Sequence, residues 1–325
     1  MDNYNSENNP FGLKILKGFG VLLVYTGLLI IGVALATLIA QAVVGTSSAD
    51  ALKLLELSKI SDDQQRQLLL TQAISATFTF IVFPLTYLLL LKKDLLPELI
   101  TNWKNIVVFL ALSILLIFTL MPVVAYVVEW NKSLHLPEAL STLEQWMLEK
   151  ETQMEKLTQF LIPYDTTSEF ILVFLVIAII PAIGEEFLFR GLLQNELHRA
   201  LGNPHIAIFL TGFLFSFIHF QFFGFFPRMM LGVLFGYLYY WSGNLLIPII
   251  VHLINNGFTL ILMNMRNKKQ LDFDIESTQS IPLGSMLFAL AVGSLLIYYY
   301  RNISLRSGIL NRDKANESPN KRNEL

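Results

Sequence analysis

Three short polar motifs interrupt an otherwise apolar stretch of this chain, between residues 170 and 265. They are Glu185-Glu186-x-x-x-Arg190, Phe215-x-x-x-His219 and His252-x-x-x-Asn256. A carboxylate or guanidinium at the depth of the bilayer core costs about 2.5–3.5 kcal/mol on insertion scales. These side chains must therefore face one another or a hydrated cavity rather than lipid, and ionisable groups inside a membrane mark functional sites.

The composition of the chain is that of a polytopic membrane protein. Of its 325 residues, 54% are hydrophobic and only 15% are charged, and the mean hydropathy is +0.55. Soluble domains contain about 25% charged residues. The formal net charge of −2 gives no reason to expect a nucleic-acid partner. The chain has no cysteine, which excludes disulfide bonds, thiolate metal ligands and a cysteine nucleophile.

Apolar runs of about 20 residues, long enough to cross a bilayer, predict an all-α transmembrane helix bundle with about eight spans. The runs cover residues 18–44, 71–92, 105–128, 168–195, 205–222, 227–241, 245–265 and 282–300. Pro181 lies inside the fourth run and predicts a kink, because proline cannot donate the helical backbone hydrogen bond. The four helices within residues 168–265 contain all three motifs and form the predicted catalytic core.

The other segments divide the chain around this core. We expect a polar N-terminal segment (1–17), N-terminal membrane helices with two amphipathic loops (18–167), the core (168–265), a loop with the last membrane helix (266–306) and a disordered tail (307–325). In the second amphipathic loop, residues 137–162, apolar side chains recur at helical spacing. This spacing predicts a helix on the membrane surface or across the end of the bundle.

Lysine and arginine residues near the ends of membrane helices predict orientation. With eight spans, many of them fall on the side of the two termini, among them Lys14, Lys92, Arg199 and Arg306. Arg266 falls on the opposite side and weakens the bias. We expect a multi-pass protein of the plasma (inner) membrane of a prokaryote, surrounded by lipid, with both termini cytoplasmic.

The first motif contains two adjacent acids and one base. Glu186 and Arg190 are four residues apart, so they share a helical face and can form an ion pair with the acid on the N-terminal side. Glu185 points about 100° away from Glu186 and has no partner in its own helix. A buried carboxylate without a partner is suited to act as a general base. A purely structural salt-bridge network of all three side chains is the alternative.

The other two motifs each place polar side chains on one helical face. Phe215 lies four residues before His219 and can enclose the imidazole in a dry pocket. His252 and Asn256 can donate hydrogen bonds to a developing oxyanion. Each motif also has a structural interpretation, because histidine and asparagine commonly provide interhelical hydrogen bonds in membranes.

Two features between these motifs have structural interpretations. Gly232-x-x-x-Gly236 predicts a close approach of two helices. Arg228, next to a phenylalanine-rich segment at residues 220–226, is interpreted as an interface anchor rather than as a carboxylate clamp.

Together, the motifs supply one acid, two imidazoles and one amide from three apolar helices. These groups are sufficient for hydrolysis, since they provide a base to activate water and donors for the oxyanion. The sequence contains no Gly-x-Ser-x-Gly and no His-Glu-x-x-His motif.

The three motifs, in this order on predicted membrane helices, resemble the CPBP family, the CAAX-protease and bacteriocin-processing (Abi) family of intramembrane proteases. This family includes the Ras-converting CAAX prenyl endopeptidase. The stretch from Gly232 through Ser242-Gly-Asn-Leu-Leu-Ile-Pro248 to His252 is also similar to the family's approach to its last motif. The resemblance covers residues 168–265 and implies an endopeptidase that acts within or beside the bilayer.

The resemblance also implies a role for each motif residue. Glu185 would activate water together with His219, while His252 and Asn256 would stabilise the oxyanion. Glu186 and Arg190 would support the helix packing, as would Phe215. No cofactor is expected. The alternative is a zinc ion bound by Glu185, His219 and His252 with Glu186 as the base, which would require Glu186 to leave Arg190.

The expected substrate is a membrane-attached or amphipathic peptide, including lipidated peptides. The alternative functions are a non-catalytic membrane protein that binds a peptide and confers immunity, and a transporter that uses the polar cluster. Transporters usually contain internal repeats with paired broken helices, and the sequence shows no such pairing. The sequence does not indicate an oligomeric state.

Overall fold

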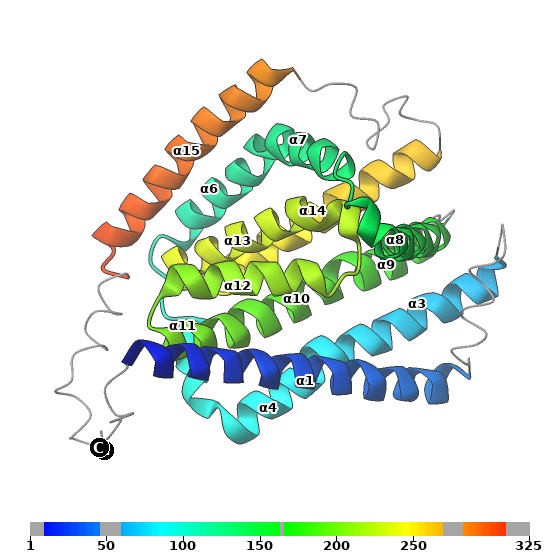
Figure 1. Ribbon diagram of the computed structural model, residues 1–325, viewed down its shortest axis with the longest axis horizontal. Helices are drawn as coiled ribbons and strands as arrows, with labels where there is room; N and C mark the ends of the chain where they lie inside the picture. Colours follow the sequence, from blue (N-terminus) through cyan, green and yellow to red (C-terminus); the bar gives the residue numbers. More distant parts are fainter. Residues whose placement is uncertain (1–9, 46–59, 163–165, 269–281, 310–325) are drawn as a thin grey trace.

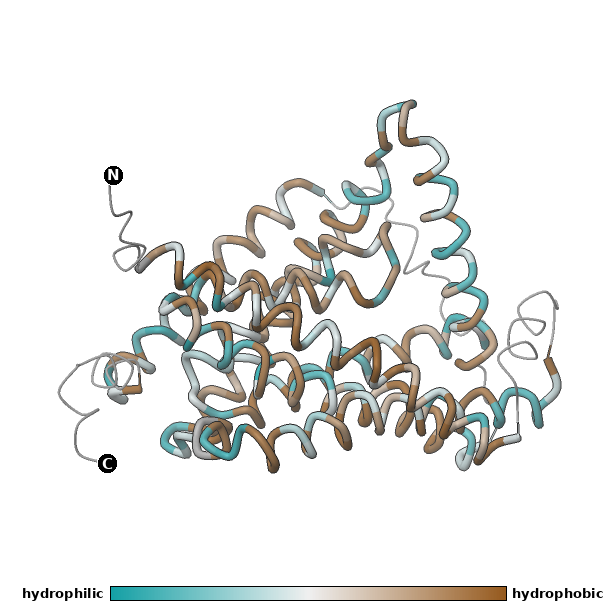
Figure 2. Tube along the Cα trace, turned by 60° about the horizontal axis from the view of Figure 1, so that its bottom comes forward, coloured by the Kyte–Doolittle hydropathy of each residue, from teal (hydrophilic) through white to brown (hydrophobic). Residues whose placement is uncertain are grey.

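The protein is a bundle of helices, described here by a computed structural model for residues 10–45, 60–162, 166–268 and 282–309 (Figure 1). Within these residues there is no sheet, and the one isolated β-bridge pairs Ile100 with Asn244. The all-α fold class predicted from the apolar runs is therefore confirmed. In Figure 2, hydrophobic residues dominate the long helices, and hydrophilic residues concentrate toward the ends of the bundle.

The helices follow the predicted apolar runs in order. They are α1 (Pro10–Val44), α3 (Asp62–Thr77), α4 (Phe83–Leu91), α5 (Leu96–Leu99), α6 (Ile106–Thr119), α7 (Met121–Lys132), α8 (Ser141–Leu161), α9 (Thr167–Phe174), α10 (Ile180–Glu186), α11 (Asn195–Leu201), α12 (Pro204–Phe217), α13 (Phe225–Ser242), α14 (Leu246–Asn267) and α15 (Leu283–Arg306). Short π-helical segments join α3 to α4 and α9 through α10 to α11. These groups consequently form two continuous helices, Asp62–Leu91 and Thr167–Leu201.

Six helices of the described chain are long and apolar enough to cross a membrane. They are Phe11–Val44, Asp62–Leu91, Thr167–Leu201, Phe222–Ser242, Leu246–Arg266 and Leu283–Arg306. The pair α6 and α7 raises the number to seven if it forms one bent span. The remaining predicted run, 205–222, becomes α12, a shorter apolar helix that ends at Phe217. The structure thus supports six or seven spans by length and composition, against the eight predicted.

The run at 105–128 forms two helices rather than one. The axes of α6 and α7 differ by 44°, and Leu120 lies between them. Pro122 occupies the first turn of α7, where its missing N–H is not needed. Since proline cannot donate a backbone hydrogen bond to the carbonyl four residues earlier, the hydrogen-bond ladder that one straight helix over residues 105–128 would need is interrupted at Pro122.

Pro181 distorts its helix locally without ending it. The turn before it, Leu175–Ile179, is π-helical, and the N–H of Ile180 bonds to the carbonyl of Leu175, five residues back. Pro181 has no backbone N–H and interrupts the regular helical hydrogen bonds. The wider π-helical turn accommodates this interruption. The helix Thr167–Leu201 therefore continues past Pro181 and carries the Glu185-Glu186 pair into the centre of the bundle.

Capping residues set the start of two helices. Ser61 caps α3 together with Gln64, and Thr166 caps α9 together with Glu169, each in a reciprocal capping box. The second membrane helix consequently begins at Asp62, well before residue 71, where the apolar run begins. The first of the two amphipathic loops expected within residues 18–167 covers residues 45–70 and lies partly outside the described residues, as does most of the tail predicted for residues 307–325.

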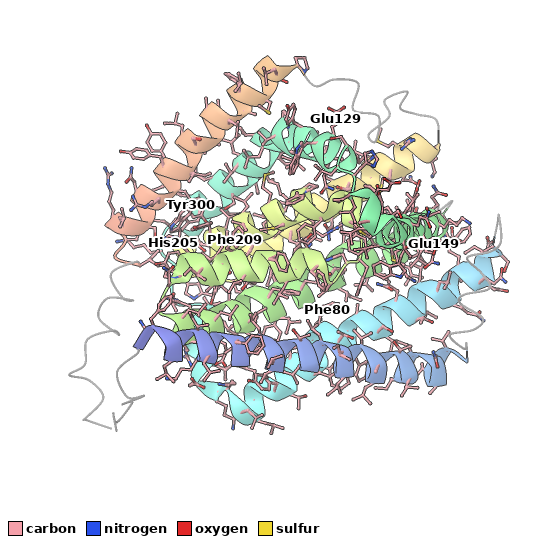
Figure 3. All side chains as sticks on the ribbon, viewed as in Figure 1. Phe80, Glu129, Glu149, His205, Phe209 and Tyr300 are labelled. Atoms are coloured by element: carbon pink, nitrogen blue, oxygen red, sulfur yellow. The ribbon has the colours of Figure 1, made fainter. Side chains whose placement is uncertain are left out.

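The helix predicted in the second loop is confirmed as α8 (Ser141–Leu161). In Figures 1 and 3, α8 lies at the end of the bundle opposite the start of α1 and the end of α15, and Glu149 marks it. His205 and Tyr300 lie toward that other end (Figure 3). The start of α1 and the end of α15 therefore lie at the same end of the bundle.

Close packing of α12 against α13 depends on glycine, as the Gly232-x-x-x-Gly236 pattern predicts. A Cβ atom at Gly232 would lie 3.1 Å from the Cα of Gly212, and one at Gly212 would lie 2.7 Å from Cγ2 of Val233 and 3.0 Å from its backbone nitrogen. With no side chain at Gly232, its backbone carbonyl is accessible to side chains of the neighbouring helix. This carbonyl accepts a hydrogen bond from Arg190 of the first polar motif.

We expect Gly212→Ala to lower the free energy of unfolding by about 1–3 kcal/mol, because the added methyl group overpacks the α12–α13 contact. A thermal or SDS titration of the protein in detergent measures this change. Gly27→Ala in α1 is the matched control, since a Cβ atom there meets nothing within 4 Å. If both variants unfold like the wild type, the close approach of these helices does not contribute to stability.

Candidate active site

Glu186 joins the first and third motifs through a single carboxylate oxygen. Its Oε1 accepts a hydrogen bond from Nη1 of Arg190 at 2.7 Å and one from Nδ1 of His252 at 2.8 Å. Glu186 and Arg190 have no exposed surface, and His252 is 4% exposed. The predicted ion pair within the helix is present, and the structure adds an interhelical contact, to α14, which sequence spacing did not indicate.

The guanidinium of Arg190 is enclosed by the α12–α13 interface. Its Nη2 donates to the carbonyl of Gly232 at 2.7 Å. Its Cζ lies 4.7 Å from the ring centroid of Phe215 and 5.5 Å from that of Phe235. Aromatic faces stabilise a buried cation through their quadrupole, so Arg190 holds three helices together while it pairs with Glu186.

Glu185 lies beside this network without joining it. Its side chain is buried, and Oε2 lies 4.0 Å from Nε2 of His252, a distance longer than a hydrogen bond. Among the described residues it accepts no hydrogen bond. The neighbouring Gly184 allows this close packing, since a Cβ atom there would lie 2.7 Å from Cβ of Phe80. Figure 3 shows Phe80 near the centre of the bundle.

His219 lies just beyond the end of α12 rather than within a helix that continues to residue 222. Its Nδ1 is 2.7 Å from the carbonyl oxygen of Phe215, and the two rings are 5.1 Å apart. The next residue, Phe220, has a φ of 51°, in the left-handed region that is uncommon for residues with a side chain. The chain therefore turns sharply at His219. Such strained positions cluster at functional sites.

Phe215 connects the two imidazoles. Its ring centroid is 6.0 Å from that of His252, in an edge-to-face arrangement, and the ring itself is 4% exposed. The predicted dry wall behind His219 is thus present, and the same ring also packs against His252 and Arg190. The phenylalanine sets the relative positions of all three motifs.

Asn256 lies one turn beyond His252 on α14 and is half-buried. Its Oδ1 accepts a hydrogen bond from Nδ2 of Asn255 at 3.3 Å, which directs its own Nδ2 donor away from Asn255. Asn255, the neighbouring amide on α14, lies off the helical face that His252 and Asn256 share. Adjacent amides on a helix can nevertheless bond side by side, and this contact orients Asn256.

Arg228 lies at the edge of the site, half-buried, at the start of α13. Its Nη2 donates to Oε1 of Gln221 at 2.6 Å. Its charge is close enough to interact with both Glu185 and Glu151. The guanidinium is therefore directed toward neighbouring polar groups. The interpretation of Arg228 as an interface anchor did not predict these neighbours.

The proposed zinc ligands do not converge. Among the described residues, no three histidine or acidic side chains are grouped closely enough to hold a metal ion. Glu186, the base in the zinc alternative, is instead bound to Arg190 and His252. The donor atoms of Glu185, His219 and His252 do not form a metal site in this arrangement.

Comparisons with known proteins match the region that contains this site. Residues 167–258 match the family of Rce1-like type II CAAX prenyl endopeptidases. A relative named membrane-embedded CAAX protease MroQ, from Staphylococcus aureus (strain USA300), is 34% identical over 91 residues, which cover 26% of this chain and 36% of the relative. The similarity thus spans about a third of that protein. No solved structure matches the chain.

Proposed function

We propose that this chain is an intramembrane endopeptidase, since residues 167–258 match the family of Rce1-like type II CAAX prenyl endopeptidases, which are hydrolases. Its substrate is a membrane-attached or amphipathic peptide. The observation that carries the proposal is the buried cluster in which Glu185, His252 and the Glu186–Arg190 pair meet, with Phe215 linking His252 to His219.

Glu185 and His219 activate the attacking water in this proposal. A backbone carbonyl can only accept a hydrogen bond, so the Nδ1 of His219 donates to Phe215 and a neutral ring keeps its lone pair on Nε2. Glu185 is buried and accepts no hydrogen bond from the described residues, so its carboxylate is free to accept a proton from water. The resulting hydroxide attacks the peptide carbonyl, and the proton is delivered to the leaving amine.

The oxyanion is stabilised by Asn256 and His252 in different ways. The Oε1 of Glu186 accepts a hydrogen bond from Arg190 and a second one from Nδ1 of His252, so the Nδ1 of His252 carries a proton. A neutral His252 ring therefore has no proton on Nε2, and it can donate to the oxyanion from Nε2 only when it is doubly protonated. The Nδ2 of Asn256 donates in every protonation state. Asn256 is consequently the donor on which the oxyanion depends throughout the pH range.

The structural residues fix this chemistry in place. Glu186 determines the orientation and the Nδ1 proton of His252, Arg190 holds Glu186, and Phe215 spaces the two imidazoles. Fixed donors and bases of this kind act without reorganisation during the reaction. We propose hydrolysis by these side chains with no metal step, because Glu186 is committed to Arg190 and the three zinc-ligand candidates do not converge.

We also propose the topology. Counting the bent pair α6–α7 and the short α12 as one span each gives eight spans, with both termini on the same side. Lys14 approaches Gly202 at that end, Lys92 pairs with Glu196 and Arg199 pairs with Asp94. Basic residues favour the cytoplasmic side, so the termini are cytoplasmic.

A mass-spectrometric cleavage assay tests the activity. The purified protein in lipid nanodiscs is incubated with a library of amphipathic and lipidated peptides, with and without a metal chelator, and a Glu185→Gln variant serves as the blank. Cleavage by the wild type alone, unaffected by chelator, supports the proposal. Cleavage that stops with chelator contradicts the metal-free mechanism, and peptide binding without cleavage indicates the non-catalytic, immunity-type alternative.

A further inference from the structure

A cavity of about 540 Å³ lies under α8, and one of the residues that line it is Gln221, two residues after His219. Its walls come from α8, from the end of α7, from the segment after His219 and from the end of α14. The charged and polar lining includes Glu151, Glu155, Thr158, Lys132, Gln221 and Arg266. The two acids belong to α8, whereas Lys132 and Arg266 belong to the other elements. The cavity therefore has an acidic wall on α8 and basic groups on the walls contributed by α7 and α14.

Glu151 is the most firmly placed charge of the acidic wall. Its Oε2 accepts a hydrogen bond from the backbone N–H of Phe223 at 3.3 Å, and it is half-buried. Burial raises the pKa of the Glu151 carboxyl, although the Phe223 N–H and the charge of Arg228 oppose this shift. Trp146, earlier on α8, packs on Phe222 with ring centroids 5.5 Å apart. These contacts hold α8 over the segment that follows His219.

The cavity lies along the same face of α14 as the proposed catalytic residues of that helix. His252, Asn256, Met263 and Arg266 share one face of this helix, and the last two line the cavity. Asn256 and Arg266 are ten residues apart, which corresponds to about 15 Å along a helix. An extended peptide covers that distance in about four or five residues. Arg228 donates a hydrogen bond to Gln221, which lines the cavity, and its charge also acts on Glu185 of the candidate site.

We infer that this cavity binds the polar flank of the peptide substrate, with a basic side chain of that flank contacting Glu151. The inference rests on the proposed peptidase function and names a specificity-determining residue for it. The basic residue lies about four or five residues from the scissile bond, the length of extended chain that spans the distance along α14. The apolar part of the substrate remains in the bilayer, and the flank leaves the reactive cluster through the cavity under α8.

Charge complementarity selects a basic residue at Glu151. Successive side chains of an extended peptide point to opposite sides, so a flank in the cavity presents one set of side chains to α8. Glu151 and Glu155, one turn apart, form the acidic surface that this set meets. An acidic side chain at the same place would face like charge, which is unfavourable in a partly buried site.

Binding to the inactive protein tests this charge preference without turnover. Glu185→Gln protein in phosphatidylcholine nanodiscs is titrated with fluorescein-labelled Leu-Ala peptides that carry Lys, Ala or Glu at positions three to six from the centre on either side. We expect the best Lys peptide to bind about ten-fold more tightly than its Glu counterpart. Adding Glu151→Lys should reverse the order, whereas adding Glu149→Lys should leave it unchanged.

Glu149, labelled in Figure 3, is the matched control because it is exposed and lies two residues before Glu151, so the two side chains point about 200° apart around α8. Equal effects of the two substitutions, or no charge preference in any peptide, would overturn the inference. Charge-selective binding without cleavage by the wild type would reject the proposed hydrolysis but retain the peptide site. Cleavage without charge selectivity would reject the site and retain the hydrolysis.

A second measurement uses the absence of cysteine from the chain. Thr158→Cys introduces a single thiol in the cavity. Thr152→Cys is the comparison variant and introduces a thiol on the exposed surface of α8. After labelling with fluorescein maleimide, we expect the Thr158→Cys protein to bind the long Lys peptide about ten-fold more weakly. A peptide shortened to two residues beyond its centre should bind unchanged. Equal loss for both peptides, or unchanged binding of the long peptide, would contradict a flank in the cavity.

Discussion

Replacement of Glu185 by glutamine is expected to reduce peptide cleavage by about 10²–10⁴-fold, the contribution of a general base. Glutamine keeps the shape of the side chain but cannot accept a proton from water. Glu185 accepts no hydrogen bond from the described residues and lies 4.0 Å from His252. The substitution therefore removes the base without breaking a hydrogen bond, and single-turnover kinetics on a cleaved peptide measures the loss.

Thermal unfolding provides the control for this result. The Glu185→Gln protein should melt like the wild type, because the ion pair of Glu186 with Arg190 is untouched. Glu196→Gln is the matched variant. Glu196 is a buried acid on the same helix as Glu185, and it pairs with Lys92 at the end of the bundle where α1 begins. It should retain activity. Cleavage by Glu185→Gln at the wild-type rate would remove Glu185 from the mechanism.

Replacement of Arg190 by alanine is expected to lower the free energy of unfolding by about 3–5 kcal/mol, the cost of leaving a buried charge without its partner. Both members of the Glu186–Arg190 pair have no exposed surface. The substitution also removes the hydrogen bond to Gly232 and the cation that packs on Phe215. SDS or thermal denaturation in detergent, with the yield of folded protein, measures the effect.

Arg199→Ala is the comparison for this variant, because Arg199 pairs with Asp94 at an exposed position, where such pairs contribute about 0–1 kcal/mol. The double variant Glu186→Gln/Arg190→Met should be more stable than Arg190→Ala, since neither charge then remains unpaired. It should still cleave poorly, because a glutamine no longer fixes the proton of His252. Equal stability of Arg190→Ala and the wild type would exclude the structural role of the pair.

The sequence determined the features that depend on spacing along one helix. Long apolar runs gave membrane helices, and the separation of four residues gave the Glu186–Arg190 pair. The recurrence of apolar residues gave α8, and the paired glycines gave the close contact of α12 and α13. The three motifs in order also indicated a resemblance to the CAAX proteases, and residues 167–258 match the family of Rce1-like type II CAAX prenyl endopeptidases. Helical periodicity is a local property, so these conclusions needed no knowledge of the tertiary structure.

Only the tertiary structure decided which helix faces meet. It placed Nδ1 of His252 on Glu186, the ring of Phe215 between the two imidazoles, and Asn255 against Asn256. It also formed the cavity under α8 from residues of four distant segments. The rotation and crossing of each helix follow from the packing of all its neighbours, so no spacing within one helix encodes these contacts. The same packing adds His252 to the carboxylate that Arg190 already holds, and it leaves Glu185 4.0 Å from that imidazole.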